Sequence, residues 1–138
     1  MKSARALAIG AMALLTSTAA AAPPSMDVTP NQINFGNQRF GTFTKQSFAV
    51  TNKSDATVII SIESIIMGDD FSPGQVESTC PLTEGSPLAP GQNCTQVIGF
   101  QPSQFFAGHE AALMRVIARD LSGKTLDTRD VRLTGRGY

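Results

Sequence analysis

Two cysteines are the residues whose spacing says most about chemistry. Cys80 and Cys94 are the two cysteines of the chain, and such a pair in an oxidising compartment most simply forms a disulfide. The bond would close a short loop and contribute about 3 kcal/mol in the chain-entropy model. A metal site would need more ligands than two thiols and one distant His109. We therefore predict a disulfide between Cys80 and Cys94, with a pair of free thiols as the alternative.

The other reactive side chains are few and follow no catalytic or metal-binding pattern. His109 is the single histidine, and no Gly-x-Ser-x-Gly motif accompanies it, so we expect a solvated loop histidine rather than part of a triad. Asp69 and Asp70 lack the Asp-x-Asp-x-Asp array of a calcium loop, which favours turn carboxylates. A periplasmic copper carrier would need a cluster of methionines. The spacing of the candidate ligands forms no such cluster; they are Met26, Met67 and Met114. We predict no catalytic residue, no cofactor and no metal.

Charge and surface motifs add little chemistry. Eleven basic residues balance eleven acidic ones, which argues against a nucleic-acid partner. Two triplets fit the N-glycosylation acceptor pattern but arise often by chance, and we discount both; they begin at Asn52 and Asn93. Four arginines near two aspartates are explained as well by cross-strand ion pairs as by a binding patch; these are Arg115, Arg119, Arg129 and Arg132 with Asp127 and Asp130.

The N-terminal segment has the layout of a secretory signal peptide. Lys2 and Arg5 precede an apolar run over residues 6–15, and small residues follow as far as Ala22. Because Pro23 should block cleavage directly before it, we expect the cut between Ala21 and Ala22. The alternative is a buried helix or an uncleaved anchor, although the run is short for a membrane span. We predict a signal peptide over residues 1–21, a linker over 22–30, one domain over 31–138, and a secreted or periplasmic product without a transmembrane segment.

The elements that position these residues are strands, because apolar residues recur with a period of two. Val58, Ile60 and Ile62 share one face of a strand, and residues 44–52 alternate in the same way. Residues 112–119 follow the same period, with a buried face expected on the side free of arginine, and Asp120 to Gly123 is a plausible hairpin turn. Residues 72–93 hold several prolines and glycines that exclude a helix or a central strand. About seven short strands predict an all-β, two-sheet sandwich.

Several short strings resemble a known family. The chain resembles bacterial choice-of-anchor D proteins and the wider ASH group of abnormal-spindle and Hydin-like domains. The matching strings run through the mature chain in order; they are residues 33–36 (INFG), 41–42 (GT), 50–52 (VTN), 68–71 (GDDF), 88–94 (LAPGQNC), 100–102 (FQP) and 133–137 (LTGRG). Gly36 and Gly41 would bracket a kink where a first strand crosses between sheets. Gln96 stands where such domains usually have an apolar residue, so its amide would need a hydrogen-bond partner.

The resemblance implies an immunoglobulin-like fold akin to PapD and major sperm protein, without catalytic residues. It also implies an exported module for protein–protein interaction or scaffolding at the cell surface or in the periplasm, which contacts a partner or itself through a sheet edge or loops. One alternative is a pilin-like filament subunit assembled by strand addition. A more remote one is a small periplasmic metal carrier or hydrolase.

Overall fold

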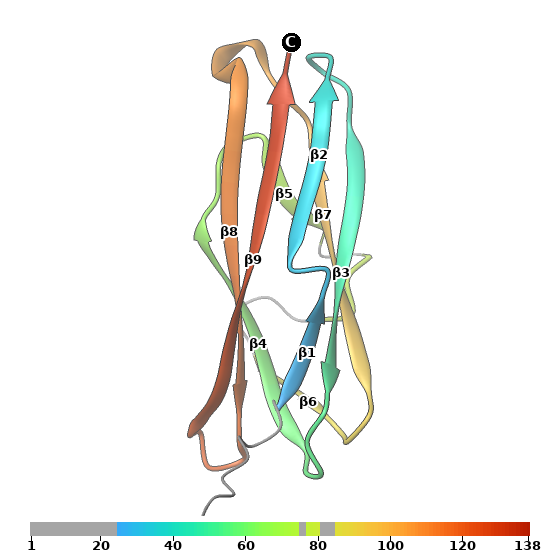
Figure 1. Ribbon diagram of the computed structural model, residues 1–138, viewed down its shortest axis with the longest axis vertical. Coiled ribbons are helices and arrows are strands. Elements are labelled where there is room, and N and C mark those ends of the chain that lie inside the picture. Colours follow the sequence, from blue (N-terminus) through green and yellow to red (C-terminus); the bar gives the residue numbers. More distant parts are fainter. Residues whose placement is uncertain (1–24, 75–76, 81–84) are drawn as a thin grey trace, which may run out of the picture.

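The chain forms a sandwich of two β-sheets, seen in a computed structural model that describes residues 25–74, 77–80 and 85–138 (Figure 1). The four-stranded sheet has the order β1-β3-β7-β5 and the five-stranded sheet the order β2-β9-β8-β4-β6. The strands of the first are β1 (Met26–Thr29), β3 (Thr44–Asn52), β7 (Asn93–Phe100) and β5 (Phe71–Gly74). Those of the second are β2 (Gln32–Gln38), β9 (Thr125–Gly137), β8 (Gly108–Arg119), β4 (Val58–Ile66) and β6 (Ser86–Leu88). A single 3₁₀ turn over Gln104–Phe106 is the helical element of the described residues.

The sandwich has more strands than the sequence predicts. The described residues form nine strands rather than about seven. Three of them are strands that the sequence pattern does not predict, and two of these, β5 and β6, lie in the proline-rich stretch. Both are short edge strands, where a missing proline N–H breaks no ladder hydrogen bond, so Pro73 and Pro87 are tolerated there. The third, β1, lies inside the segment expected to be a linker and pairs antiparallel with β3.

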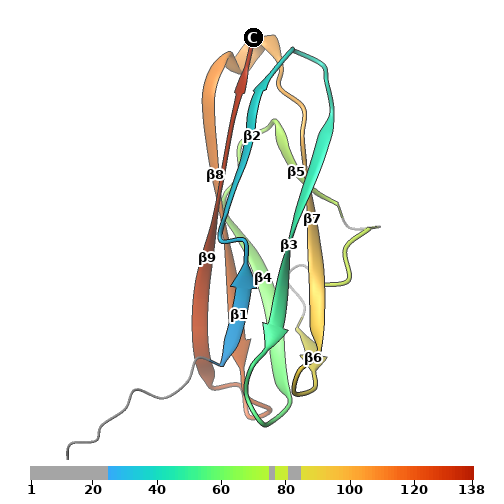
Figure 2. The same cartoon turned by 45° about the vertical axis from the view of Figure 1, so that its right-hand side comes forward.

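The first strand crosses between the sheets earlier than expected. β1 pairs with β3 in one sheet, and after Pro30 and Asn31 the chain continues as β2, which pairs parallel with β9 in the other (Figure 2). The sequence placed this crossing near Gly36 and Gly41, which is wrong. Gly36 instead lies at a register shift between β2 and β9 and Gly41 in the β2–β3 connection, each with a positive φ that favours glycine.

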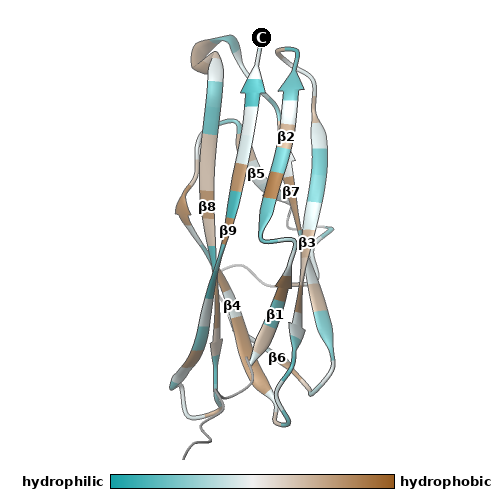
Figure 3. Cartoon of the chain, in the orientation of Figure 1, coloured by the Kyte–Doolittle hydropathy of each residue, from teal (hydrophilic) through white to brown (hydrophobic). Residues whose placement is uncertain are grey.

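The core lies between the sheets and follows the predicted alternation. The predicted inward faces of β4 and β8 are both buried, and brown and teal residues follow one another along β2 and β9 (Figure 3). At one end Phe35, Phe71 and Phe100 pack together, with the Phe71 and Phe100 ring centroids 4.7 Å apart. Gly135 leaves room for this cluster, because a Cβ there would lie 2.6 Å from the Phe100 ring.

Two buried amides are held by hydrogen bonds. Asn52 is fully buried; its Nδ2 donates to the carbonyls of Ala56 and Leu88, each at 2.8 Å, and its Oδ1 accepts from Ser54. Asn52 thereby ties the β3–β4 turn to β6. Gln96, which needed a partner, donates from Nε2 to Ser78 Oγ at 3.0 Å.

Candidate interaction surface

The edges of both sheets are poorly suited to adding another strand. On β2, the carbonyl oxygens of Asn34 and Phe35 accept hydrogen bonds from the side chains of Gln46 and Gln38. The edge strands β1, β5 and β6 have only three or four residues each. Beyond its pairing with β6, β4 carries Glu63 and shifts register against β8 between Ser64 and Ile66, which bends the strand. Short, irregular, charged or capped edges disfavour pairing with another chain, so the connections are the better candidates for an interaction surface.

Three connections meet at one end of the sandwich, together with Tyr138. They join β2 to β3 (residues 39–43), β4 to β5 (67–70) and β7 to β8 (101–107), and we call them with Tyr138 the loop end. Phe40 N donates to the Tyr138 carbonyl at 3.0 Å and Gly41 N to the Pro102 carbonyl at 2.8 Å. Gln101 N donates to the Asp70 carbonyl at 2.9 Å. These bonds link the connections into one surface beside the label C in Figure 2.

Exposed aromatic rings gather on the loop end. Phe105 is 81% exposed and Phe106 is 45% exposed, both in the 3₁₀ turn of the β7–β8 connection. Tyr138 is 59% and Phe40 39% exposed. Large apolar side chains gathered on a surface mark interaction sites more often than scattered ones do.

A hollow of about 610 Å³ opens among the connections of the loop end. Its lining comes from Phe40 and Gly41, from Asp69, Asp70 and Ser72, and from the segment 101–104. The wall therefore combines an aromatic ring with carboxyl and amide groups.

Two carboxyl groups near this end of the sandwich differ from ordinary surface carboxylates. Asp70 is buried, and its Oδ2 accepts a hydrogen bond from Ser103 N at 2.9 Å. Burial raises the pKa of Glu110 from 4.5 to about 7, helped by a hydrogen bond with Asp70 and by the charges of Asp70 and Asp69. Sequence reasoning missed Glu110. The available signal was its place on the face of residues 108–119 that carries no arginine, because a carboxyl group on an inward face is unusual.

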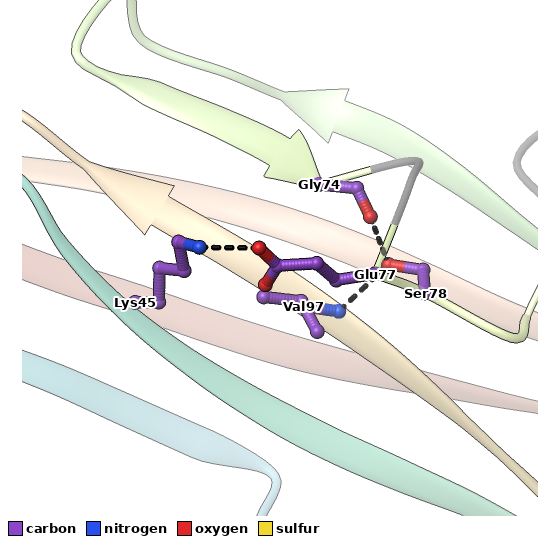
Figure 4. Close-up of polar contacts among 5 residues, drawn as sticks. All are labelled: Lys45, Gly74, Glu77, Ser78 and Val97. Carbon is purple, nitrogen blue, oxygen red and sulfur yellow. Dashed lines mark hydrogen bonds and ion pairs between the residues drawn. The ribbon is translucent and has the colours of Figure 1, made fainter.

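A second set of polar contacts fixes the segment between β5 and the first cysteine (Figure 4). Ser78 Oγ donates to the Gly74 carbonyl and accepts a hydrogen bond from Val97 N. Lys45 pairs with Glu77 above the same sheet. These contacts hold residues 77–78 against β7 and give them a structural role.

The cysteine pair lies directly after this segment. Cys80 and Cys94 form a disulfide with their Cα atoms 4.9 Å apart, and both are buried. Thr79 N and Cys80 N both donate to the Thr95 carbonyl. The disulfide therefore fastens the chain to the start of β7.

The remaining candidate residues are dispersed. His109 is exposed, as expected, but it lies at the second position of β8 rather than in a loop. In the β8–β9 pairing it is opposite Arg136. Met26 and Met114 are core residues. No group of three or more potential metal-ligating His, Cys, Asp or Glu side chains occurs in the part of the chain that the structure describes. Ala21 and Ala22, the expected cleavage site, lie outside the described residues.

The expected arginine–aspartate pairs form only in part. Arg115 pairs with Asp130 across β8 and β9, with Nε 2.8 Å from Oδ1. Arg129 pairs with Asp127 of its own strand at 3.2 Å. Arg119 instead donates to Ser61 Oγ on β4.

Comparison with solved structures identifies the fold. No family model matches the chain, and no curated protein matches it. Among solved structures it is similar to the ASH/PapD-like domain 7 of human CEP192, with a TM-score of 0.64, 15% identity, and 93% of this chain and 96% of that one covered. The chain has a PapD-like, immunoglobulin-like fold.

Two other similar structures are a chaperone and a protease. The YadV chaperone matches with a TM-score of 0.57, 11% identity, and 82% of this chain and 52% of the chaperone covered. The Vibrio cholerae VesB protease matches with a TM-score of 0.62 and 18% identity, over 81% of this chain and 32% of the protease. At these identities the likeness shows the fold alone, and it confirms the predicted sandwich without confirming the choice-of-anchor D family. Across the residues described, no helix is long and apolar enough to cross a membrane.

Proposed function

We propose that this chain is an exported, non-catalytic immunoglobulin-like module that binds a partner protein through its loop end. The observation that carries the proposal is the exposure of Phe105, Phe106, Phe40 and Tyr138 on the same loop end, whose connections are joined by backbone hydrogen bonds. Aromatic side chains are enriched at protein interfaces and supply much of the binding energy there. The PapD-like fold and its likeness to a chaperone and to an ASH domain support a role in protein interaction. Membership of the choice-of-anchor D family is part of the same proposal.

Site-specific photocrosslinking tests the surface in cells that express the protein. A photoreactive phenylalanine analogue replaces Phe105 in one variant and Leu121 in the matched control. Leu121 is 74% exposed and lies in the β8–β9 turn, away from the loop end. We expect a discrete protein adduct from position 105 that is absent from position 121. Equal adducts from both positions, or none from either, would contradict the proposed surface.

Export is supported by the disulfide, since such bonds persist in oxidising compartments. The signal peptide over residues 1–21 remains a proposal. N-terminal sequencing of protein recovered from the periplasm or the medium should begin at Ala22. An uncut chain retained in the cytoplasm would refute export.

The filament alternative is tested by self-association. Strand addition needs an open edge, and the edges described above are short, capped or irregular. Light scattering after size exclusion at increasing protein concentration should therefore report a monomer. Concentration-dependent polymers would instead favour the filament.

A further inference from the structure

A second hollow, of about 430 Å³, lies on the outer face of the five-stranded sheet. It forms where β2, β9 and β8 run side by side (Figure 1), near the register shift of β2 and the start of β8. Two glycines belong to its lining, and every other lining side chain is polar; these are Asn34, Asn37, His109, Thr134 and Arg136. The lining therefore combines one fixed cation with neutral hydrogen-bonding groups and contains no carboxylate.

Arg136 stands at the centre of this set. In the register of the sheet it is opposite Asn37 of β2 on one side and His109 of β8 on the other. Adjacent strands are about 4.8 Å apart, so both neighbouring side chains reach the space around the guanidinium. Thr134 lies two residues earlier on the same face of β9, where its neighbour on β2 is Asn34. Three strands thus bring five polar side chains to one place.

The donors of this set are not used by the rest of the described chain. Asn34 Oδ1 accepts a hydrogen bond from Gly36 N at 2.8 Å, which leaves Nδ2 as the free end of this side chain. Among residues 25–74, 77–80 and 85–138, the other four lining side chains make no hydrogen bond, and the ion pairs lie elsewhere. A guanidinium has five N–H donors, an amide two, and an imidazole or a hydroxyl at least one. The hollow is therefore rich in donors that lack an acceptor.

The charge pattern around Arg136 differs from that around Arg115 of the same sheet. Arg115 is directly opposite Asp130 and pairs with it, as expected for cross-strand neighbours of opposite charge. Arg136 has only an amide and an imidazole as cross-strand neighbours. Glu110 follows His109 in sequence, but it lies on the opposite face of β8 because successive side chains alternate. An acceptor with negative charge is what this position lacks.

We propose that this hollow binds an oxyanion, the carboxylate or phosphate group of a ligand, with Arg136 as its central contact. A planar guanidinium donates two parallel hydrogen bonds to two oxygens of such a group. The neighbouring amides, imidazole and hydroxyl donate to the lone pairs that remain. The site goes beyond the proposed function, because none of its residues belongs to the connections of the loop end or to Tyr138.

An NMR titration of the free protein at pH 7 tests the site, with acetate and methyl phosphate as probes and sodium chloride at matched ionic strength as the reference. We expect saturable shifts of the Arg136 Nε–H and Asn37 side-chain amide signals, half-complete at about 10 mM or below for at least one probe. Chloride should give no saturable shift. A preference of at least about fivefold for one probe identifies a carboxylate or a phosphate as the natural group, and equal binding identifies a site for either.

Replacing Arg136 removes the central contact. Arg136→Gln should raise the half-saturating probe concentration at least about tenfold, because the charge and the paired donors are lost together. Arg132→Gln is the matched control, since Arg132 is exposed on the same face of β9 but does not line the hollow. It should change the half-saturating concentration by less than about twofold.

A second variant fills the site from within. Asn37→Asp places a carboxylate directly across from Arg136, which should occupy the guanidinium and prevent the probes from binding. Gln32→Glu makes the same chemical change beside Arg132 and should leave binding intact. Circular dichroism verifies that each variant folds. Shifts that do not saturate, that chloride reproduces, or that weaken equally in Arg136→Gln and Arg132→Gln would overturn the site. The titration needs no partner, so its result is independent of the crosslinking at position 105.

Discussion

Replacing Asn52 by aspartate tests whether one buried amide secures the end of the sandwich opposite the loop end. The two side chains have nearly the same shape, so the change removes the Nδ2 donor without opening a cavity. In the native protein this donor bonds to the carbonyls of Ala56 and Leu88 at 2.8 Å each. In Asn52→Asp those two carbonyls face a carboxylate oxygen instead, while the acceptor side towards Ser54 is preserved.

The expected loss follows from the two unpaired carbonyls. A buried polar group left without its partner costs about 1–3 kcal/mol, so Asn52→Asp should lower the free energy of unfolding by roughly 2–5 kcal/mol. Domains of this kind have total stabilities of about 5–15 kcal/mol. With a urea m-value of about 1–3 kcal/mol/M, the unfolding midpoint should fall by about 0.7 M or more.

Urea unfolding followed by circular dichroism measures this loss, with Asn93→Asp as the control. Asn93 is exposed at the start of β7, and its replacement makes the same chemical change. Because a protonated carboxyl can donate one hydrogen bond, the Asn52→Asp defect should shrink at acidic pH. A loss below about 1 kcal/mol, or one equal to that of the control, would refute the role assigned to Asn52.

Three further outcomes are expected. Replacing Cys80 and Cys94 together by serine should lower the free energy of unfolding by about 3 kcal/mol, measured by urea unfolding against the wild type under oxidising conditions. Gly135→Ala should cost about 1–3 kcal/mol, because its Cβ would lie 2.6 Å from the Phe100 ring, and an unchanged melting temperature would contradict this packing. The raised pKa of Glu110 means that the folded chain binds more protons than the unfolded chain between about pH 4.5 and pH 7. Stability should therefore fall as pH rises through this window, by about 1–2 kcal/mol after allowance for partial solvation, and a Glu110→Gln chain should not show this fall.

Much of the sandwich could be predicted because its longer strands alternate regularly. Val58, Ile60 and Ile62 are all buried, as the period of two predicts. The short strands β1, β5 and β6 have too few residues to show a period, and long-range pairing rather than local sequence creates them. The crossing after Pro30 was missed for the same reason, since it depends on which sheet each half of the first strand can pair with.

The candidate surface was harder to predict than the fold. A loop-borne interaction was among the expectations, and Asp69 and Asp70 were correctly assigned to a connection. The place of Glu110 could not be found by spacing, because it lies on a strand forty residues after Asp70. Only the topology brings Glu110, at the start of β8, beside Gly68 of the β4–β5 connection.

The direction of β1 places the start of the described chain far from the loop end. Met26, at the start of β1, pairs with Asn52 at the end of β3. In Figure 2, β1 lies in the half of the sandwich away from the label C. A tether attached upstream of Met26 would therefore point Phe105 and Phe106 away from whatever holds it, at the full length of the sandwich. A fluorophore or fusion appended after Tyr138 would sit against those rings and obstruct them, so probes of this protein belong on the β8–β9 turn near Leu121.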